Sequence, residues 1–283
     1  MTKIGFNMLA WSQVVSDDLM PNVERLKKIG YDGIEVTLGT DDIEAYRRLG
    51  NFVSQLDMEV NCVMPLGPQE NPISSDPKVR SKAIDQLKWG IDRASEMEAK
   101  VICGPFHSAF GTFANKPPDE QEMQWSAEVL SAAAEYAGQA EITLAIEALN
   151  RFECYLCNTM EQLVELSKRV SHPNLGVMFD THHANIEEKS FSKAIDTAAR
   201  HLKHVHISEN DRGTPGDGLV QWDEVFASLS KHHYDGWLTI ESFTRNDPEF
   251  SNAINVWREF SAPWDVAEDG FVFINRMREK HGL

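Results

Sequence analysis

Basic residues are scarce in this chain of 283 residues. Acidic residues outnumber them 44 to 27, which gives a formal net charge of −17 at pH 7. A protein that binds a nucleic-acid duplex neutralises phosphates with lysine and arginine. The charge balance therefore argues against nucleic acid as a main partner.

Long apolar runs are also missing. No stretch of about eighteen apolar residues is present, so the sequence predicts no membrane-spanning helix. The first segment, MTKIGFNMLAW, carries one lysine and a short apolar run. It lacks the long apolar stretch and the small-residue cleavage site of a signal peptide. We therefore expect a cytoplasmic protein with its first strand in this segment.

Cysteine is used sparingly, at four positions in the chain. Cys62 and Cys103 lie singly in strand-like runs, which indicates core thiols. Cys154 and Cys157 form a C-x-x-C, but no second pair is present to complete a zinc site. We interpret all four as reduced thiols that pack without carrying out the chemistry.

Short strand-like runs alternate with amphipathic segments along the whole chain. The runs are KIGFNML, GIEVTL, EVNCVM, VICGPF, TLAIEAL, LGVMFDT, LKHVHI and WLTIESF. Between them, apolar residues recur at spacings of three and four, as in LMPNVERLKKIG, where a glycine marks the end of the predicted helix.

Strands that alternate with helices indicate parallel strands joined by right-handed crossovers. Eight such units in a chain of this length predict a single (β/α)8 TIM barrel over residues 1–283. The alternative is an open doubly wound sheet, but its G-x-G-x-x-G after the first strand is absent. The segment GTPGDG at 213–218 lacks the lysine of a phosphate-binding loop, so we interpret it as a turn.

Four of the predicted strands end in a group that could bind a metal. They are Glu147, Asp180, His206 and Glu241, at intervals of 33, 26 and 35 residues. One unit of a barrel of about 250 residues spans roughly 31 residues, so these groups belong to neighbouring strands. Since active sites of such barrels lie at the carboxyl ends of the strands, we expect the four side chains to converge.

Three carboxylates and one imidazole suit a divalent cation such as Mn²⁺, Mg²⁺ or Co²⁺. Each residue alone also has a structural interpretation: a buried ion pair for the glutamates, a helix cap for Asp180, and a core histidine for His206. Together the acids would repel one another, and a cation would relieve that repulsion. His204 would share the face of His206 one layer deeper and is interpreted as a supporting or core residue.

The second half of the chain resembles the ketose 3-epimerases of the D-tagatose 3-epimerase type, within the xylose isomerase-like barrel superfamily. The matching segments are EALNRFECYLCN, FDTHHANIEE, HVHISENDRGTPGDGLVQWDEVF and IESF. The resemblance implies that the four strand-end residues bind the metal, Mn²⁺ first with Co²⁺ or Mg²⁺ as alternatives. It also implies that Glu147 and Glu241 form the acid/base pair, and that Glu153, His183 and Arg212 hold the oxygens around C1 to C3 of the sugar.

The function implied by the resemblance is inversion of C3 of a free ketose, such as D-tagatose, D-psicose or L-ribulose, through an enediolate. A homodimer or homotetramer is implied in the same way. Two other classes stay open. One is another metal-dependent barrel enzyme, either an aldose–ketose isomerase or an inosose dehydratase. The other is an endonuclease-like hydrolase, which would need more histidines and a basic groove that the charge of −17 opposes.

Overall fold

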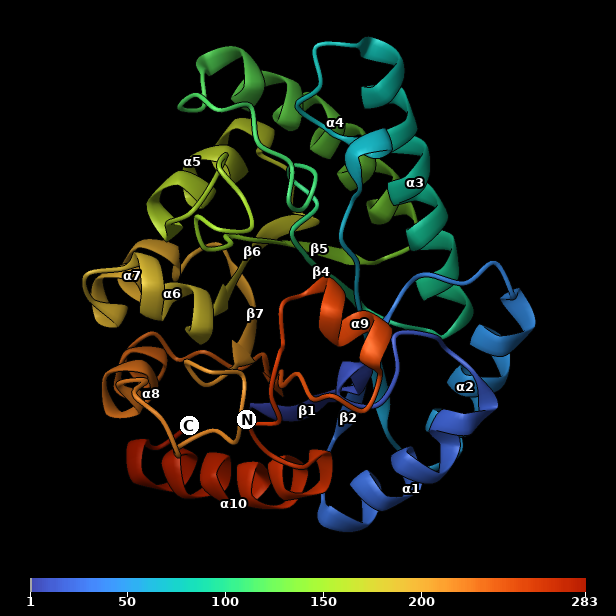
Figure 1. The fold of residues 1–283 in the computed structure, drawn as a ribbon, viewed down its shortest axis with the longest axis vertical. Helices are drawn as coiled ribbons and strands as arrows, with labels where there is room; N and C mark the ends of the chain where they lie inside the picture. The colour runs from blue at the N-terminus through green and yellow to red at the C-terminus, as the bar shows by residue number, and fades with distance from the viewer. Residues whose placement is uncertain (1) are drawn as a thin grey trace.

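Parallel strands form a closed barrel at the centre of the molecule, and helices surround it (Figure 1). The computed structural model describes residues 2–283. The strands follow in chain order around the barrel as β1 (Lys3–Asn7), β2 (Gly33–Thr37), β3 (Glu59–Val63), β4 (Val101–Gly104), β5 (Thr143–Glu147), β6 (Leu175–Asp180), β7 (Leu202–Ile207) and β8 (Trp237–Ile240). The pairing of β1 with β8 closes the barrel, which confirms the predicted fold over the open-sheet alternative.

The helices occupy the segments between the strands and after the last one. They are α1 (Met20–Ile29), α2 (Ile43–Gln55), α3 (Pro77–Glu96), α4 (Glu120–Gln139), α5 (Met160–Val170), α6 (Thr181–Glu187), α7 (Phe191–Ala198), α8 (Trp222–Lys231), α9 (Pro248–Ala253) and α10 (Pro263–His281). Short 3-10 turns lie at Met8–Ala10, Asp17–Leu19 and Pro68–Glu70. Within residues 2–283, no helix is both long and apolar enough to cross a membrane.

Local sequence signals account for the ends of the helices. Helix α1 buries Val23 and Leu26 and stops at Gly30, whose φ of 122° lies in the region that favours glycine. Helix α5 begins with a capping box, in which Thr159 and Gln162 each satisfy a backbone N–H of the other. The predicted helix end in the first case is thus confirmed.

Alternation along the strands divides the apolar side chains between two faces. On β5, Leu144 and Ile146 belong to the large core between barrel and helices, whereas Ala145 belongs to a separate cluster. That second cluster contains Leu9, Val63, Val101, Cys103, Ala145 and Met178. Because neighbouring residues of a strand point to opposite faces, this cluster fills the barrel interior. It packs beneath the polar residues at the carboxyl ends of the strands.

Candidate active site

The four strand-end groups converge at the mouth of the barrel. Glu147 and Asp180 are the last residues of β5 and β6, His206 is the last but one of β7, and Glu241 directly follows β8. Nδ1 of His206 lies 3.3 Å from Oε1 of Glu241 and 3.6 Å from Oδ2 of Asp180. Ligand atoms of Glu147, Asp180 and His206 all lie within 4.8 Å of one another. The structure thus brings together the residues that the strand spacing singled out.

Arg212 reaches into this cluster from the loop after β7. Its Nη1 donates to Oδ2 of Asp180 at 3.1 Å and to Oε2 of Glu241 at 2.5 Å. Its Nη2 lies 3.0 Å from Nε2 of His183. The guanidinium is therefore a buried positive charge shared between two carboxylates, and these carboxylates keep its pKa above the ordinary value despite its burial.

His183 is held as a neutral ring. Its Nδ1 accepts the backbone N–H of Asn150 at 3.1 Å, and its Nε2 faces Nη2 of Arg212 at 3.0 Å. Burial, together with the charge of Arg212, lowers the pKa of His183 to about 3. Nε2 lies 3.5 Å from Oε1 of Glu147 and borders the pocket.

Glu153 lies at the same pocket, in the loop after β5. The side-chain amide of Asn150 donates to its Oε1 at 3.0 Å, which fixes one oxygen and leaves the other for a ligand. Asn150 therefore orients both His183 and Glu153. This arrangement explains why the two residues, thirty positions apart in the chain, present their polar atoms to one space.

Asp180 caps a helix and also faces the cluster of candidate metal ligands, as the two interpretations of its sequence position predicted. Its Oδ1 accepts the backbone N–H groups of His182 at 2.7 Å and His183 at 3.0 Å, so it caps α6. Its Oδ2 faces Arg212 and His206. Burial would raise the pKa of Asp180, but the positive charge of Arg212 holds it well below its usual range.

Glu147 has the opposite electrostatic environment. Burial raises the pKa of Glu147 well above the usual value, and the charges of Glu241 and Asp180 raise it further. Its backbone carbonyl contacts Nε2 of the buried His107 at 2.8 Å, which fixes the end of β5. A carboxyl whose pKa is raised in this way is suited to exchange a proton with a bound molecule.

The glycine-rich loop that carries Arg212 is held by the buried Glu209. The two oxygens of Glu209 accept from the backbone N–H of Gly216 at 2.9 Å, that of Val220 at 3.0 Å, and Nε1 of Trp222 at 2.9 Å. Gly216 has a φ of 97°, and a Cβ there would lie 2.6 Å from the ring of Phe273. The segment 213–218 is therefore a tight turn, as its sequence predicted, and it delivers Arg212 to the site.

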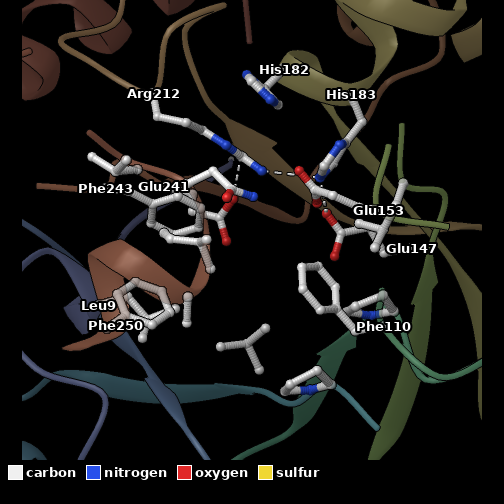
Figure 2. Close-up of a pocket in the computed structure, with 18 of the residues that line it drawn as sticks. Leu9, Phe110, Glu147, Glu153, His182, His183, Arg212, Glu241, Phe243 and Phe250 are labelled. Carbon is white, nitrogen blue, oxygen red and sulfur yellow. Dashed lines mark hydrogen bonds and ion pairs between the residues drawn. The ribbon is translucent and has the colours of Figure 1, made fainter. Parts of the chain in front are cut away.

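A cavity of about 450 Å³ opens above these groups. Figure 2 shows Arg212, His183, Glu153, Glu147 and Glu241 gathered at one end, with the Glu147 and Glu241 carboxylates projecting from two sides. Apolar side chains line the other end: Leu9, Val63, Pro65, Pro105, Phe110, Phe250 and Ile254. Phe250 belongs to α9 and Ile254 directly follows it, so this segment contributes a wall of the pocket (Figure 2 labels Phe250).

The donor set fits a divalent cation. Nδ1 of His206 is buried without a hydrogen-bond partner and faces Asp180 and Glu241. Its other ring nitrogen, Nε2, lies 2.8 Å from Oε1 of Glu35. An orphaned imidazole nitrogen beside carboxylate oxygens is an arrangement suited to a divalent cation, which would offset the crowded negative charge.

The contacts of Glu35 and His107 near the site could not be predicted from the sequence. Glu35 is fully buried in β2 and lies 2.9 Å from Nε2 of His204 as well as beside His206. The available signal was an acid in the middle of the apolar run GIEVTL, since a buried carboxylate needs partners. His107 follows β4 and supports Glu147, but nothing in its local sequence indicates that contact.

The four cysteines are buried free thiols, as the sequence predicted. Cys154 lies in the loop that also carries Glu153, and its sulfur is 3.3 Å from the hydroxyl of Ser108. Burial raises the pKa of the Cys154 thiol, so it stays protonated near neutral pH and packs the loop.

A closed parallel barrel with titratable groups on successive strand ends defines the class of (β/α)8-barrel enzymes that work at the carboxyl face of the barrel. Comparison with known proteins narrows this class. The chain belongs to the xylose isomerase-like TIM barrel family, whose model matches residues 23–260.

Two relatives and one solved structure extend this assignment. The chain is 30% identical over 275 residues to a probable ketose 3-epimerase of Synechocystis sp., covering 97% of this chain and 96% of the relative. It is 31% identical over 270 residues to the D-psicose 3-epimerase of Agrobacterium fabrum, covering 94% and 93%. The D-allulose 3-epimerase of Methylomonas sp. in complex with D-allulose superimposes with a TM-score of 0.91 at 27% identity, covering 98% and 97%. The resemblance to ketose 3-epimerases is confirmed.

Proposed function

We propose that the protein is an isomerase-class enzyme that inverts the configuration at C3 of a free ketose. The observation that carries this proposal is the placement of Glu147 and Glu241, whose carboxylates enter one pocket from two sides (Figure 2). Inversion by proton transfer needs one group on each face of the reacting carbon. The similarity to ketose 3-epimerases over nearly the whole chain supports the same reaction.

The two carboxylates would exchange the C3 proton. This proton is acidified by the neighbouring C2 carbonyl, so one carboxylate removes it as general base and leaves an enediolate. The carboxyl on the opposite face then delivers a proton and inverts the centre. In the reverse direction, Glu147 and Glu241 exchange roles, which accounts for a pair of identical acids.

Glu147, Asp180, His206 and Glu241 would hold a divalent cation, Mn²⁺ first and Co²⁺ or Mg²⁺ as alternatives. When bound, such an ion supplies Lewis-acid stabilisation of the negative charge that develops on the sugar oxygens. The orphaned Nδ1 of His206 and the three carboxylates around it support this assignment.

Glu153, His183 and Arg212 would orient the sugar through the oxygens of C1 to C3. The imidazole of His183 can hydrogen-bond to a sugar hydroxyl, Glu153 can accept from a hydroxyl, and Arg212 can neutralise an oxyanion. Because the loop of Arg212 is held by Glu209, the guanidinium is positioned before the substrate binds.

Analysis of products tests the reaction class. The purified protein is incubated with Mn²⁺ and either D-psicose, D-tagatose or L-ribulose, and the sugars are separated by chromatography. We expect each active ketose to give its C3 epimer as another ketose. An aldose product would identify an aldose–ketose isomerase instead. Loss of water in a parallel incubation with a cyclic inosose, without turnover of the ketoses, would identify a dehydratase.

We further propose a homodimer or homotetramer. Phe152, between Arg151 and Glu153 in the loop after β5, is 74% exposed. An apolar ring so exposed beside the site is suited to burial against another copy of the chain. Light scattering on the eluted protein should give two or four times the chain mass of 32.0 kDa, whereas a monomer would contradict the proposal.

A further inference from the structure

A buried carboxylate lies on the far side of the His206 ring from the candidate cation site. It belongs to Glu35 of β2, whose side chain is fully buried. Its Oε1 accepts the side-chain amide of Asn7 at 2.8 Å and lies 2.8 Å from Nε2 of His206. Its Oε2 accepts from the thiol of Cys103 at 3.1 Å and lies 2.9 Å from Nε2 of His204.

Hydrogen bonds engage both oxygens of the Glu35 carboxylate. An ionised carboxylate has about four lone-pair sites and no proton to give. Asn7 and His206 meet Oε1 and Cys103 meets Oε2, while Nε2 of His204 lies near Oε2 without a hydrogen bond. The acceptor therefore requires that His206 present a proton on Nε2. In a neutral imidazole this places the lone pair on Nδ1, which faces Asp180 and Glu241.

We propose that Glu35 is a positioning residue that fixes His206 in the tautomer with its proton on Nε2, and thereby presents Nδ1 to the cation. This inference rests on the cation site of the proposed function. Glu35 touches neither the pocket nor the sugar, so it acts through His206 alone. The outer ring nitrogen of a metal-binding histidine is commonly held by a carboxylate in this way.

The same residues could instead hold a second ion. One ligand atom from each of Glu35, Cys103, His204 and His206 lies within 4.8 Å of the others. The distance to His206 favours a hydrogen bond, however. Two donors bound at about 2.0–2.1 Å to one tetrahedral zinc would lie about 3.3 Å apart, whereas Nε2 of His206 lies 2.8 Å from Oε1 of Glu35.

The first test uses the wild-type protein and needs no variant. Histidine labelled with ¹⁵N is incorporated, and the tautomer of His206 is read by two-bond nitrogen–proton NMR in the metal-free protein, with Mg²⁺ added afterwards. We expect a protonated Nε2 before and after addition, and an unprotonated Nδ1 once Mg²⁺ is bound. An unprotonated Nε2 in either state would overturn the proposal.

The second test measures cation affinity in Glu35→Gln. The substitution keeps the shape but replaces one acceptor oxygen by a donor amide. We expect the Kd for Mn²⁺, measured by competition with a chelator, to rise by roughly ten- to a hundredfold. The matched control is Glu122→Gln, since Glu122 is a buried carboxylate on α4 that accepts from the hydroxyl of Tyr155 at 2.8 Å. The control should keep the wild-type Kd.

An unchanged Kd in folded Glu35→Gln would overturn the role of Glu35. The spectrum of the Co²⁺-loaded protein separates this role from a second ion. We expect one Co²⁺ per chain and no thiolate-to-cobalt charge-transfer band. Two Co²⁺ per chain, with a charge-transfer band that Cys103→Ser removes, would also overturn the proposal. Failure of the wild-type protein to bind Mn²⁺ or Co²⁺ would overturn the cation site itself, which is a distinct outcome.

Discussion

Arg212 donates a hydrogen bond from Nη1 to Oε2 of Glu241 at a distance of 2.5 Å. The same nitrogen lies 3.1 Å from Oδ2 of Asp180. A guanidinium and a metal ion would therefore share two carboxylates, because Asp180 and Glu241 balance Arg212 and are also proposed to bind the cation. Mutation can therefore separate the contribution of Arg212 to catalysis from its effect on cation binding.

Arg212→Ala should lower kcat/KM for the preferred ketose by about 10²- to 10³-fold, because a preorganised charge near the developing oxyanion is lost. The Kd for Mn²⁺ should stay the same or fall, since Nη1 no longer competes for Asp180 and Glu241. Kinetics and chelator competition check both parts. The control is Arg151→Ala, which removes an exposed arginine paired with Glu187 and should leave both values unchanged. Loss of Mn²⁺ in Arg212→Ala would show that the arginine supports the cation.

Glu153→Gln should raise KM and lower kcat, while the Mn²⁺ content stays at the wild-type level. Glu153 is held by Asn150 at the pocket, but it is not in the cluster of Glu147, Asp180 and His206. The change removes the charge and one acceptor with little change in volume. Elemental analysis of the purified variant decides the point, and a metal-depleted protein would contradict its assignment to the substrate.

Removal of divalent cations should abolish turnover, and Mn²⁺ or Co²⁺ should restore it. Three buried carboxylates surround His206. Without a cation, their negative charge would oppose the negative charge that develops on the sugar oxygens. The measurement is activity after extensive dialysis against chelator, with metal content verified before and after. Full activity in a verified metal-free preparation would contradict the metal assignment.

The reaction in D₂O should place deuterium at C3 of the ketose product. If Glu147 and Glu241 act on opposite faces, the delivered proton comes from a carboxyl that exchanges with solvent. NMR of the recovered sugar locates the label. Glu241→Gln should stop inversion yet leave slow exchange at C3 through Glu147, provided that the cation stays bound. An inverted product without deuterium at C3 would exclude proton exchange through the two carboxylates.

His107 should make the protein sensitive to moderate acid. Burial lowers the pKa of His107 to about 4, from an ordinary value of about 6.5. The unfolded chain takes up the proton first, so the stabilisation is complete above about pH 6.5 and is lost as the pH falls towards 4. The loss amounts to about 3 kcal/mol for this one residue. Urea unfolding between pH 7 and 4.5 should show a shallower pH dependence for His107→Gln, and an unchanged slope would contradict the assignment.

The strands and the strand-end residues could be predicted because they depend on local pattern and even spacing. Each observed strand lies within one of the predicted apolar runs, and Glu147, Asp180 and His206 lie on them as expected, with Glu241 one residue beyond β8. The opening of a helix by Asp180 and its place in the cluster are also readable from FDTHH. In these cases the chain itself carries the periodicity that the fold uses.

Contacts across the barrel could not be predicted in the same way. Glu35 on β2 meets His206 on β7, and the two are 171 positions apart in the chain. Glu209 holds its own loop by accepting from backbone N–H groups. Because almost any residue type can supply such a group, the sequence does not reveal these contacts. Such contacts depend on where each strand lies around the barrel and on which of its side chains point inward at the same height. A single sequence shows neither.

The pocket draws its reactive side chains from β5 to β8 and much of its apolar wall from the segments after β1, β3 and β4. The reactive residues of the pocket and much of its apolar wall thus come from different segments of the chain. Substitution of Leu9, Val63 or Phe110 can change the shape of the pocket without changing Glu147 or Glu241, the proposed acid/base residues. A laboratory evolution campaign for a new ketose would begin its libraries at Leu9, Val63 and Phe110, together with Phe250 and Ile254.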